Sequence, residues 1–586
     1  MPVMTVGSGG GVGGKSRRSR RPGAVTGSAM KVVAKMPSIR ARPIGRAKEV
    51  RLGDAASESL RRGLRRVADA VAVTFGPGGR AVLLEREGGA PNVSRDGYTV
   101  ANTISLPDRM EDIGARIMRE ASKATAEKSG DGSTTATVLA RALVDEGARL
   151  MAAGASGMLL RRGIEAAATH VGRQLGLRAE PADDERTLTA IATTAVGVAD
   201  GGRLVGEMVR ELGGDGQIRV QTGPVPGLQG RYVRGMQMDR GWASPRFVTD
   251  PQQKTAALDA PLILLTGDRI QDPRLMAALL GRIATVQPNR PVVIVALEFS
   301  QAALELLTVN VQKGALQALA MAAPGIGQSR FEILQDLAAC TGATVLPGLG
   351  LALGQTPAFL EGALGSAGRI VAWRTAALIA DGAGEAAAVA ARAEVIRRQV
   401  EASPPGFERR IARERLARLA GRVGVIEVGA ATEAERLDLV RRLTGAVEAT
   451  KWCLRDGAVP GGGSTLAWIA DEIDPAGWPE NERQGVLAMK RALTAPLCQI
   501  STNAGYDGDL VLETMMSKDR GMGFDAGAGR YGDLREAGVV DSVEVLRTAV
   551  RHAATVAGTM LSTGAAVHYS ATAQWPRDSE DAPPIG

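Results

Sequence analysis

An aspartate, two glycines and three hydroxyl side chains precede an alanine-rich stretch in the segment SGDGSTTATVLA (129–140). The pattern predicts a helix that begins near Ser133, and Ser or Thr commonly satisfies the free N–H groups of a first helical turn. Those N–H groups also bind phosphate, and a carboxylate such as Asp131 beside a phosphate is a common ligand of Mg²⁺. The segment alone leaves the structural and the chemical interpretation open.

Two glycine-rich segments could also approach an anion. TFGPGGR (74–80) places three glycines around a proline, and glycine lets a backbone come close to an oxyanion. An ordinary turn explains this heptapeptide equally well. GGG at 461–463 precedes another predicted helix. Each motif by itself is a weak signal.

Three kinds of segment must position these motifs in a chain of 586 residues, which is too long for one core. Residues 49–177 have a helical pattern that a hairpin-like piece at 80–97 interrupts. Residues 234–423 alternate short apolar runs with amphipathic stretches, and the chain is then helical again to about 571. In the middle part we expect strands at 261–267, 290–298 and 342–348 and helices at 272–286 and 301–319.

The composition excludes several classes of protein. Hydrophobic residues make up 45% of the chain but aromatic residues only 3%, so the cores must consist mainly of Ala, Val, Leu and Ile. No apolar run reaches the roughly 18 residues of a membrane span. The three cysteines form no CxxC pair, which argues against a disulfide framework and against a zinc site.

The net charge of +8 comes from the first residues. Residues 1–48 hold eleven Lys and Arg and no acid, which leaves 60 basic against 63 acidic residues in the remainder. The composition predicts a disordered basic extension at 1–45. It is a dispensable tail or a misplaced start (Met30 or Met36), a mitochondrial or plastid transit peptide, or an arm that touches RNA or a membrane. We favour the first interpretation and expect a cytoplasmic protein.

Six segments occur in the order found in group I chaperonins, the GroEL-like family, and the chain resembles that family over about residues 46–571. They are AVTFGPGGRAVLLE, VSRDG, GDGSTTATVLA, GMQMDRGWASPRFV, LAGRVGVIEVGAATE and GAVPGGGSTLAWIA. The resemblance implies a mostly α fold with an α/β insertion in three domains. These are a helical equatorial domain (46–177 and 456–571), a small intermediate domain (178–233 and 424–455) and an α/β apical domain (234–423), followed by a polar tail (572–586).

The resemblance also implies a site for ATP with Mg²⁺, and K⁺ as a further ion. Asp131 is the expected Mg²⁺ ligand, and Phe524 and Asp525 replace the usual Tyr and Asn. The nucleotide-binding residues implied are Thr74, Phe75, Gly76, Pro77, Arg95, Asp131, Gly132, Ser133, Thr134, Thr135, Gly461, Gly462, Ile500, Phe524, Asp525, Ala526 and Asp541.

The residue that should orient the attacking water is missing. The family uses an intermediate-domain Asp for this, and counting back from Gly463 the matching position is Gly445. Glycine cannot hold a water, and losing such a group typically costs about 10²–10⁴ in rate. Asp96 matches a second family carboxylate near the γ-phosphate. Glu448 lies about one helical turn beyond Gly445, and we expect it to face solvent.

The apical domain and the hinges also depart from the family pattern. Apolar residues there should hold unfolded polypeptides and a co-chaperonin lid, but Arg246 and Thr308 make the expected groove more polar. The binding residues implied are Trp242, Phe247, Leu280, Leu304, Thr308 and Val309. The hinge residues implied are Gly235, Gly421, Arg422, Pro181 and Gly457, and Arg422 replaces a glycine.

The sequence therefore predicts a divergent chaperonin subunit that binds ATP and non-native polypeptides, forms a heptameric or mixed ring, and hydrolyses ATP slowly. Two alternatives stay open. One is a fully active protein-folding ATPase with a compensating carboxylate. The other is a scaffold that no longer folds proteins and that engages acidic partners or nucleic acid through residues 1–48.

Overall fold

The computed structural model describes residues 48–85, 91–251, 253–325, 327–348, 354, 356–404, 406–419 and 422–569. Residues 49–568 form one compact unit. The predicted basic extension (1–45), the polar tail and Gly421 lie outside the described residues. Among the helices of the described part, none is long and apolar enough to cross a membrane. The boundaries of the three expected domains stay a prediction.

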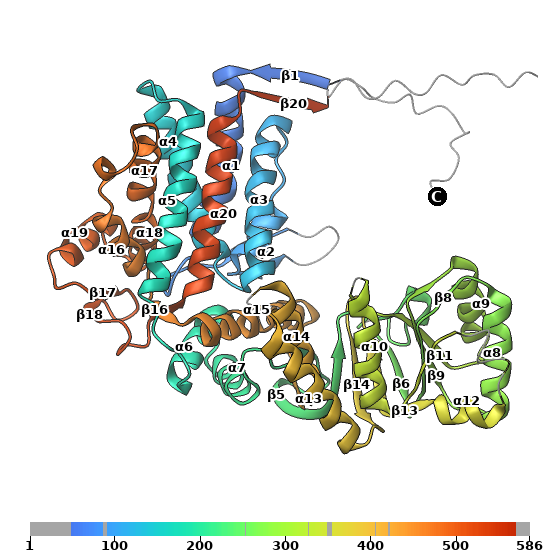
Figure 1. Cartoon of the computed structure of the whole chain (residues 1–586). Helices are drawn as coiled ribbons and strands as arrows, with labels where there is room; N and C mark the ends of the chain where they lie inside the picture. Colours follow the sequence, from blue (N-terminus) through green and yellow to red (C-terminus); the bar gives the residue numbers. More distant parts are fainter. Residues whose placement is uncertain are drawn as a thin grey trace, which may run out of the picture. The chain divides into compact units, whose positions relative to one another are not determined.

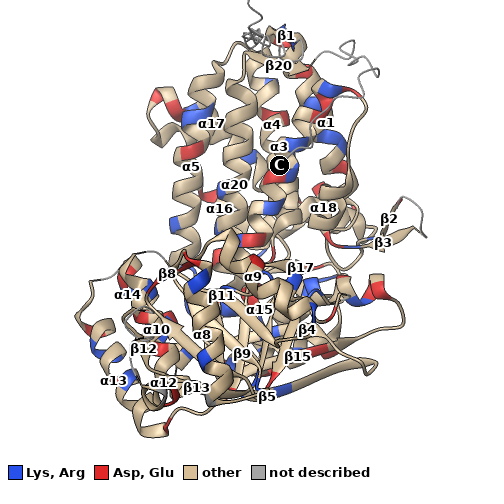
Figure 2. Ribbon diagram, turned by 90° about the vertical axis from the view of Figure 1, so that its right-hand side faces the viewer, with Lys and Arg blue, Asp and Glu red and all other residues tan. Residues whose placement is uncertain are grey.

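A bundle of long helices is built from both ends of the chain (Figure 1). Helix α20 lies against α4 and α5, while α1 packs on α3 and α5 on α17. Basic and acidic residues are both spread along these helices (Figure 2). The helices are α1 (Gly53–Ala72), α2 (Gly97–Thr103), α3 (Arg109–Ser129), α4 (Ser133–Ala152), α5 (Gly157–Leu177), α16 (Ser464–Glu472), α17 (Glu480–Ala492), α18 (Ala495–Asn503), α19 (Gly508–Met516) and α20 (Val543–Ser562).

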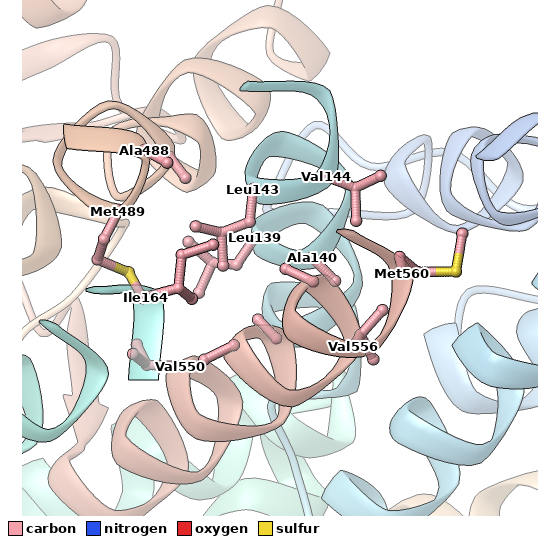
Figure 3. Packing of buried hydrophobic residues seen from close by; sticks show 14 of the residues in the cluster. Leu139, Ala140, Leu143, Val144, Ile164, Ala488, Met489, Val550, Val556 and Met560 are labelled. Atoms are coloured by element: carbon pink, nitrogen blue, oxygen red, sulfur yellow. The ribbon is translucent and has the colours of Figure 1, made fainter. Parts of the chain in front are cut away.

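The core of this bundle consists mainly of aliphatic side chains, as the low aromatic content predicts. Figure 3 shows Leu139 and Leu143 of α4, Ile164 of α5 and Val550 of α20 among them. Glycines bring the helices close, because a side chain at Gly63 of α1 would overlap the backbone of α3. Small side chains thus let long helices pack closely.

Short strands connect or flank the helices of the bundle. Strands β2 and β3 form the expected hairpin, with residues 86–90 outside the described part, and β16 pairs with β19. The strands are β1 (Lys48–Leu52), β2 (Val82–Leu84), β3 (Asn92–Ser94), β16 (Ala458–Pro460), β17 (Met522–Asp525), β18 (Arg530–Asp533), β19 (Val540–Ser542) and β20 (Ala565–Tyr569).

A ten-stranded mixed sheet spans the middle of the chain in the order β11-β9-β7-β13-β14-β5-β15-β4, with β12 beside β7 and β6 beside β13. Its strands are β4 (Ile218–Thr222), β5 (Gly227–Met238), β6 (Ala256–Asp259), β7 (Leu262–Thr266), β9 (Val292–Ala296), β11 (Ala318–Ala322), β12 (Val345–Leu346), β13 (Gly365–Ala372), β14 (Ala377–Gly382) and β15 (Arg422–Gly429). A separate short pair joins β8 (Arg269–Ile270) to β10 (Glu298–Phe299).

Strand β5 pairs with two different neighbours along its length. Its first part, Gly227–Arg234, pairs with β15, and its last part, Gly235–Met238, pairs with β14. One strand therefore joins the β15–β4 end of the sheet to the β14–β11 end.

The remaining helices accompany this sheet. Helices α6, α7 and α15 share a small apolar core with β4 and β15. These helices are α6 (Glu185–Val196), α7 (Ala199–Leu212), α8 (Pro273–Val286), α9 (Gln301–Gln312), α10 (Gln328–Thr341), α12 (Pro357–Ala363), α13 (Ala386–Ala402), α14 (Phe407–Leu419) and α15 (Glu433–Asp456).

The structure confirms the three predicted strands as β7, β9 and β12 and the helix at 272–286 as α8. The predicted helix at 301–319 is wrong in its second half. Helix α9 ends at Gln312, Gly314 adopts a left-handed φ of 69°, and the chain then enters the buried strand β11. The apolar residues of 318–322 therefore belong to the sheet.

Candidate functional site

The start of helix α4 carries the hydroxyl row of the sequence motif. Gly132 is the N-cap residue with a left-handed φ of 86°, and among the described residues no side chain caps this helix. Ser133 is buried, while Thr134 and Thr135 are half-buried. The first N–H groups of α4 are thus the kind of donors that bind phosphate oxygens.

The start of helix α2 lies against the start of α4. Asp96 caps α2 by accepting a hydrogen bond at Oδ2 from the backbone N–H of Thr99 (2.6 Å). A side chain at Gly97 would overlap the hydroxyl of Thr134. The SRDG and GDGSTT motifs therefore meet in space, while Arg95 beside them is exposed.

The half-buried carboxyl groups of Asp131 and Asp541 lie close enough to each other, and Asp131 to Asp96, for their charges to interact. Burial raises the pKa of Asp131, although a hydrogen bond from the N–H of Gly132 opposes this, and the charge of Asp96 raises it further. Burial and the charge of Asp131 raise the pKa of Asp541 to about 7. A Cβ atom on Gly461 would lie 3.2 Å from Cγ of Asp541, so the GGG segment lies beside these acids.

This set of carboxylates fits a hard cation that also has phosphate ligands. Mg²⁺ is usually held by one or two carboxylates together with waters and phosphate oxygens. In the described part of the chain, no group of three or more His, Cys, Asp or Glu side chains could hold a metal alone. Asp131 and Asp541 would hold Mg²⁺ jointly with a nucleotide.

The TFGPGGR loop lies against helix α18. Gly76 has a φ of 78°, and Cβ there would lie 2.8 Å from the side chain of Ile500. Asn503 Nδ2 donates hydrogen bonds to the carbonyl oxygens of Ala72 (2.8 Å) and Phe75 (2.9 Å). Asn503 thus fixes the loop, a role that the sequence motifs do not indicate.

The residues expected around the base and ribose form an apolar cluster. Ile500, Phe524 and Ala526 are buried together, with Phe75 packed on them. Phe524 also contacts Tyr506 and Tyr531, with ring centroids 5.1 and 4.9 Å away.

Polar atoms of two other predicted residues are occupied locally. Oδ1 of Asp525 accepts hydrogen bonds from the N–H groups of Gly527 and Ala528 (both 3.0 Å), within its own turn. The hydroxyl of Thr74 donates to the carbonyl oxygen of Val71. Pro77 lies beside the Asp525 turn, because Cβ on Gly527 would lie 3.6 Å from the Pro77 ring.

Helix α15 contacts these loops at Gly445. A side chain at Gly445 would overlap the carbonyl oxygen of Gly130, the C-cap residue that follows α3. One turn further on, Glu448 is exposed and forms an ion pair with Lys451 (3.1 Å), as expected of a solvent-facing charge. Trp452 Nε1 donates to the carbonyl oxygen of Lys128 (3.2 Å) and adds a second contact between α15 and the end of α3.

Arg441 of α15 reaches the acid that caps α2. Its Nη1 lies 2.6 Å from Oδ2 of Asp96, and its Nη2 donates to Oδ1 of Asp438 (2.8 Å). The guanidinium carbon is 5.7 Å from the ring centroid of Tyr98. The sequence motifs give no sign of this pair, since 345 positions separate its members.

The predicted polypeptide-binding residues fall into two groups. Phe247 and Thr308 are 2% and 1% exposed, and the Thr308 hydroxyl donates to the carbonyl oxygen of Leu304. Leu280, Leu304 and Trp242 are half-buried, and Val309 is 39% exposed. A pocket of ≈ 500 Å³ involves Trp242 and Leu304, and its other lining residues include Asp239, Arg240, Phe299, Glu298 and Arg374.

The predicted hinge residues lie at two places. At the first place, the segments that contain Pro181 and Gly457 run side by side. Their neighbours Glu180 and Ala458 form an antiparallel bridge with two backbone hydrogen bonds (2.9 and 3.0 Å). Gly235 and Arg422 lie at the other place, on β5 and β15.

At that second place the side chains are held in position. Arg422 forms an ion pair with Glu211 (2.7 Å) and lies 5.1 Å from the ring centroid of Tyr232. A side chain at Gly235 would overlap the carbonyl oxygen of Ile379.

Comparison with known proteins gives a family match over most of the chain. The model of the TCP-1/cpn60 chaperonin family matches residues 67–568.

Solved structures of a phage protein have a similar fold. The chaperonin gp146 from the bacteriophage EL 2 (Pseudomonas aeruginosa), in the presence of ATP-BeFx, matches with a TM-score of 0.67 at 20% identity, over 88% of this chain and 98% of that one. A second crystal form of that protein gives a TM-score of 0.63 at 21% identity with the same coverage. At this identity the similarity shows the fold.

Proposed function

Because the chain belongs to the TCP-1/cpn60 chaperonin family, we propose that it is an ATP-binding subunit that captures non-native polypeptides and hydrolyses ATP slowly. The observation that carries this proposal is the meeting of the α4 start, the α2 start and the GGG segment around Asp131 and Asp541. These segments lie far apart in the sequence and supply N–H donors and carboxylates at one place.

The chain's own residues have separate roles at this site. The N–H groups at the α4 start and the hydroxyls of Thr134 and Thr135 would bind phosphate oxygens. Asp131 and Asp541 would hold Mg²⁺, which neutralises phosphate charge when bound. The cluster around Phe524 would face the adenine, and K⁺ is a further ion that the family resemblance suggests.

Slow hydrolysis is supported by what surrounds the expected position of the water. Gly445 has no carboxylate, and its Cα faces the backbone of Gly130. Glu448 is paired with Lys451, and Asp96 is occupied by Thr99 and Arg441. A water there would lack the base that usually orients it, which costs about 10²–10⁴ in rate.

Capture of non-native chains is supported by the exposed apolar side chains of α9. Val309 with half-buried Leu304 and Trp242 offers a small apolar surface. The charged groups around the adjoining pocket and the exposed Arg246 make it more polar than a simple apolar groove. We expect weaker capture of clients and an altered fit to any co-chaperonin lid.

Assembly into a heptameric or mixed ring is part of the proposal. Leu83 and Val93 on the β2–β3 hairpin are 73% and 56% exposed, as expected of side chains that a neighbouring subunit covers. A cytoplasmic location is also proposed.

Negative-stain images of the purified protein and an aggregation assay with a chemically denatured client test this function. We expect rings, and we expect the protein to suppress aggregation, with ATP changing the effect. Val309→Asp should reduce suppression about tenfold. Val395→Asp is the matched control, because Val395 lies on α13 and is 45% exposed.

Other results would favour the alternatives. Phosphate release at ordinary chaperonin rates would favour the fully active ATPase. Neither rings nor suppression would favour the scaffold, and RNA binding that is lost on deleting residues 1–45 would support that role.

A further inference from the structure

The ion pair between Arg441 and Asp96 links helix α15 to the proposed phosphate site. Asp96 begins α2, and the next residue, Gly97, lies against the Thr134 hydroxyl at the start of α4. Arg441 therefore contacts the residue that directly precedes Gly97, and Gly97 lies against the start of α4. The pair is partly covered, since the two side chains are 33% and 19% exposed.

Two further groups hold the guanidinium group of Arg441. Asp438, one turn earlier on α15, accepts a hydrogen bond from Nη2, and the ring of Tyr98 lies near the guanidinium carbon. Nη1 is thus directed toward Asp96 by Asp438 on its own helix and by Tyr98 on α2. A planar guanidinium fixed in this way loses little freedom when it binds an oxyanion.

Helix α15 also contacts the end of α3 directly beside the proposed phosphate site. The backbones of Gly445 and Gly130 touch, and Trp452 bonds to Lys128. An added contact between Arg441 and a phosphate would strengthen the same docking of α15 onto the loops.

We propose that Arg441 is a phosphate-binding arginine of α15 that contacts the terminal phosphate of ATP and so makes the site prefer a nucleoside triphosphate over a diphosphate. This inference rests on the proposed nucleotide-binding function. A phosphate oxygen carries charge comparable to the Asp96 carboxylate and accepts charge-assisted hydrogen bonds from arginine, so Nη1 would share or exchange its partner. A diphosphate lacks the terminal phosphate that Arg441 would contact.

The test measures the affinities of ATP (as a non-hydrolysable analogue) and ADP, each with Mg²⁺, by calorimetry on the full-length protein. Arg441→Gln should weaken binding of the analogue about ten- to hundredfold, the usual effect of losing a hydrogen bond to a charged group, and leave ADP affinity within about twofold. Arg441→Lys should retain part of the preference, because it keeps the charge but not the fork.

Arg442→Gln is the matched control. Arg442 also bonds to Asp438 (2.8 Å), but its Nη1 donates to the carbonyl oxygen of Val196 rather than to Asp96. It should change the melting temperature about as much as Arg441→Gln does, without changing the ratio of the two affinities.

The remaining outcomes separate a failure of the Arg441 inference from a failure of the proposed nucleotide binding. Equal weakening of both nucleotides, no weakening, or tighter binding of the analogue by Arg441→Gln would overturn the inference while leaving nucleotide binding intact. If the unaltered protein binds neither nucleotide, the proposed function fails, and the role of Arg441 fails with it.

Discussion

A side chain at Gly445 would overlap the carbonyl oxygen of Gly130, and a side chain at Gly130 would overlap the carbonyl oxygen of Gly445. The two backbones are in direct contact, and Gly130 has a left-handed φ of 76°. The sequence alone presents Gly445 as a lost carboxylate. The structure adds that this position leaves no room for one.

Restoring the carboxylate should therefore fail. We expect Gly445→Asp to give no gain in steady-state phosphate release, because its Cβ would push α15 away from the loops. Gly445→Ala should lower the free energy of unfolding by up to about 2 kcal/mol, since overpacking costs about 1–3 kcal/mol and the better helix propensity returns about 1. Thr444→Ala, at an exposed neighbouring position, is the control, and a tenfold gain with Gly445→Asp would contradict this account.

Asp131 should carry the metal dependence of nucleotide binding. We expect Asp131→Asn to remove most of the difference in ATP affinity measured with Mg²⁺ and with EDTA, because the amide oxygen is a weaker ligand for a hard cation. Asp519→Asn, a change of the same kind at an exposed position, should leave the difference intact. A full Mg²⁺ effect in the Asp131 variant would show that the ion binds elsewhere.

Asp541 should make the stability of the nucleotide-free protein depend on pH. Its pKa is raised from 3.8 to about 7 in the folded state, so the folded protein holds a proton that the unfolded chain releases. Proton binding at Asp541 therefore favours the folded state less and less as the pH rises from about 4 to about 7, and the free energy of unfolding falls over this range. Thermal melts of Asp541→Asn, which cannot ionise, should show a larger advantage over the unaltered protein at pH 8 than at pH 5. An advantage independent of pH would rule out this role.

A buried ion network should dominate the stability of the helices beside the sheet. Asp336 of α10 is fully buried and bonds to Arg392 of α13 (2.7 Å) and Arg415 of α14 (2.7 and 2.9 Å). Removing one partner of such a network leaves a charge buried alone, so Asp336→Ala should cost about 3–5 kcal/mol in denaturant unfolding.

Glu394→Ala serves as the control for that change. Glu394 belongs to an exposed pair with Arg397 on one helix, so its loss should cost about 0.5 kcal/mol or less. Equal losses in the free energy of unfolding for Asp336→Ala and Glu394→Ala would mean that the buried network contributes no more to stability than the exposed pair.

The sequence predicted the strands β7, β9 and β12, helix α8 and the helix starts that follow Asp131 and Gly461–Gly463, because periodicity and glycine content act locally; it missed strand β11. It did not predict that Phe247 and Thr308 are buried, since spacing does not tell which side of a helix or turn meets the core. Nor did it predict the Arg441–Asp96 pair. Such contacts depend on the docking of distant elements, which no local pattern encodes.

The continuous pairing of strand β5 restricts how the two ends of the sheet can move relative to each other. Because its ladder passes from β15 to β14 at Arg234 and Gly235 without a break, the β14 end of the sheet could swing only by twisting the strand or by shearing backbone hydrogen bonds. A loop hinge would let the same swing occur at almost no cost in hydrogen bonds. Deuterium uptake by the amides around Gly235 would therefore report directly on how often the two ends of the sheet change their relative orientation.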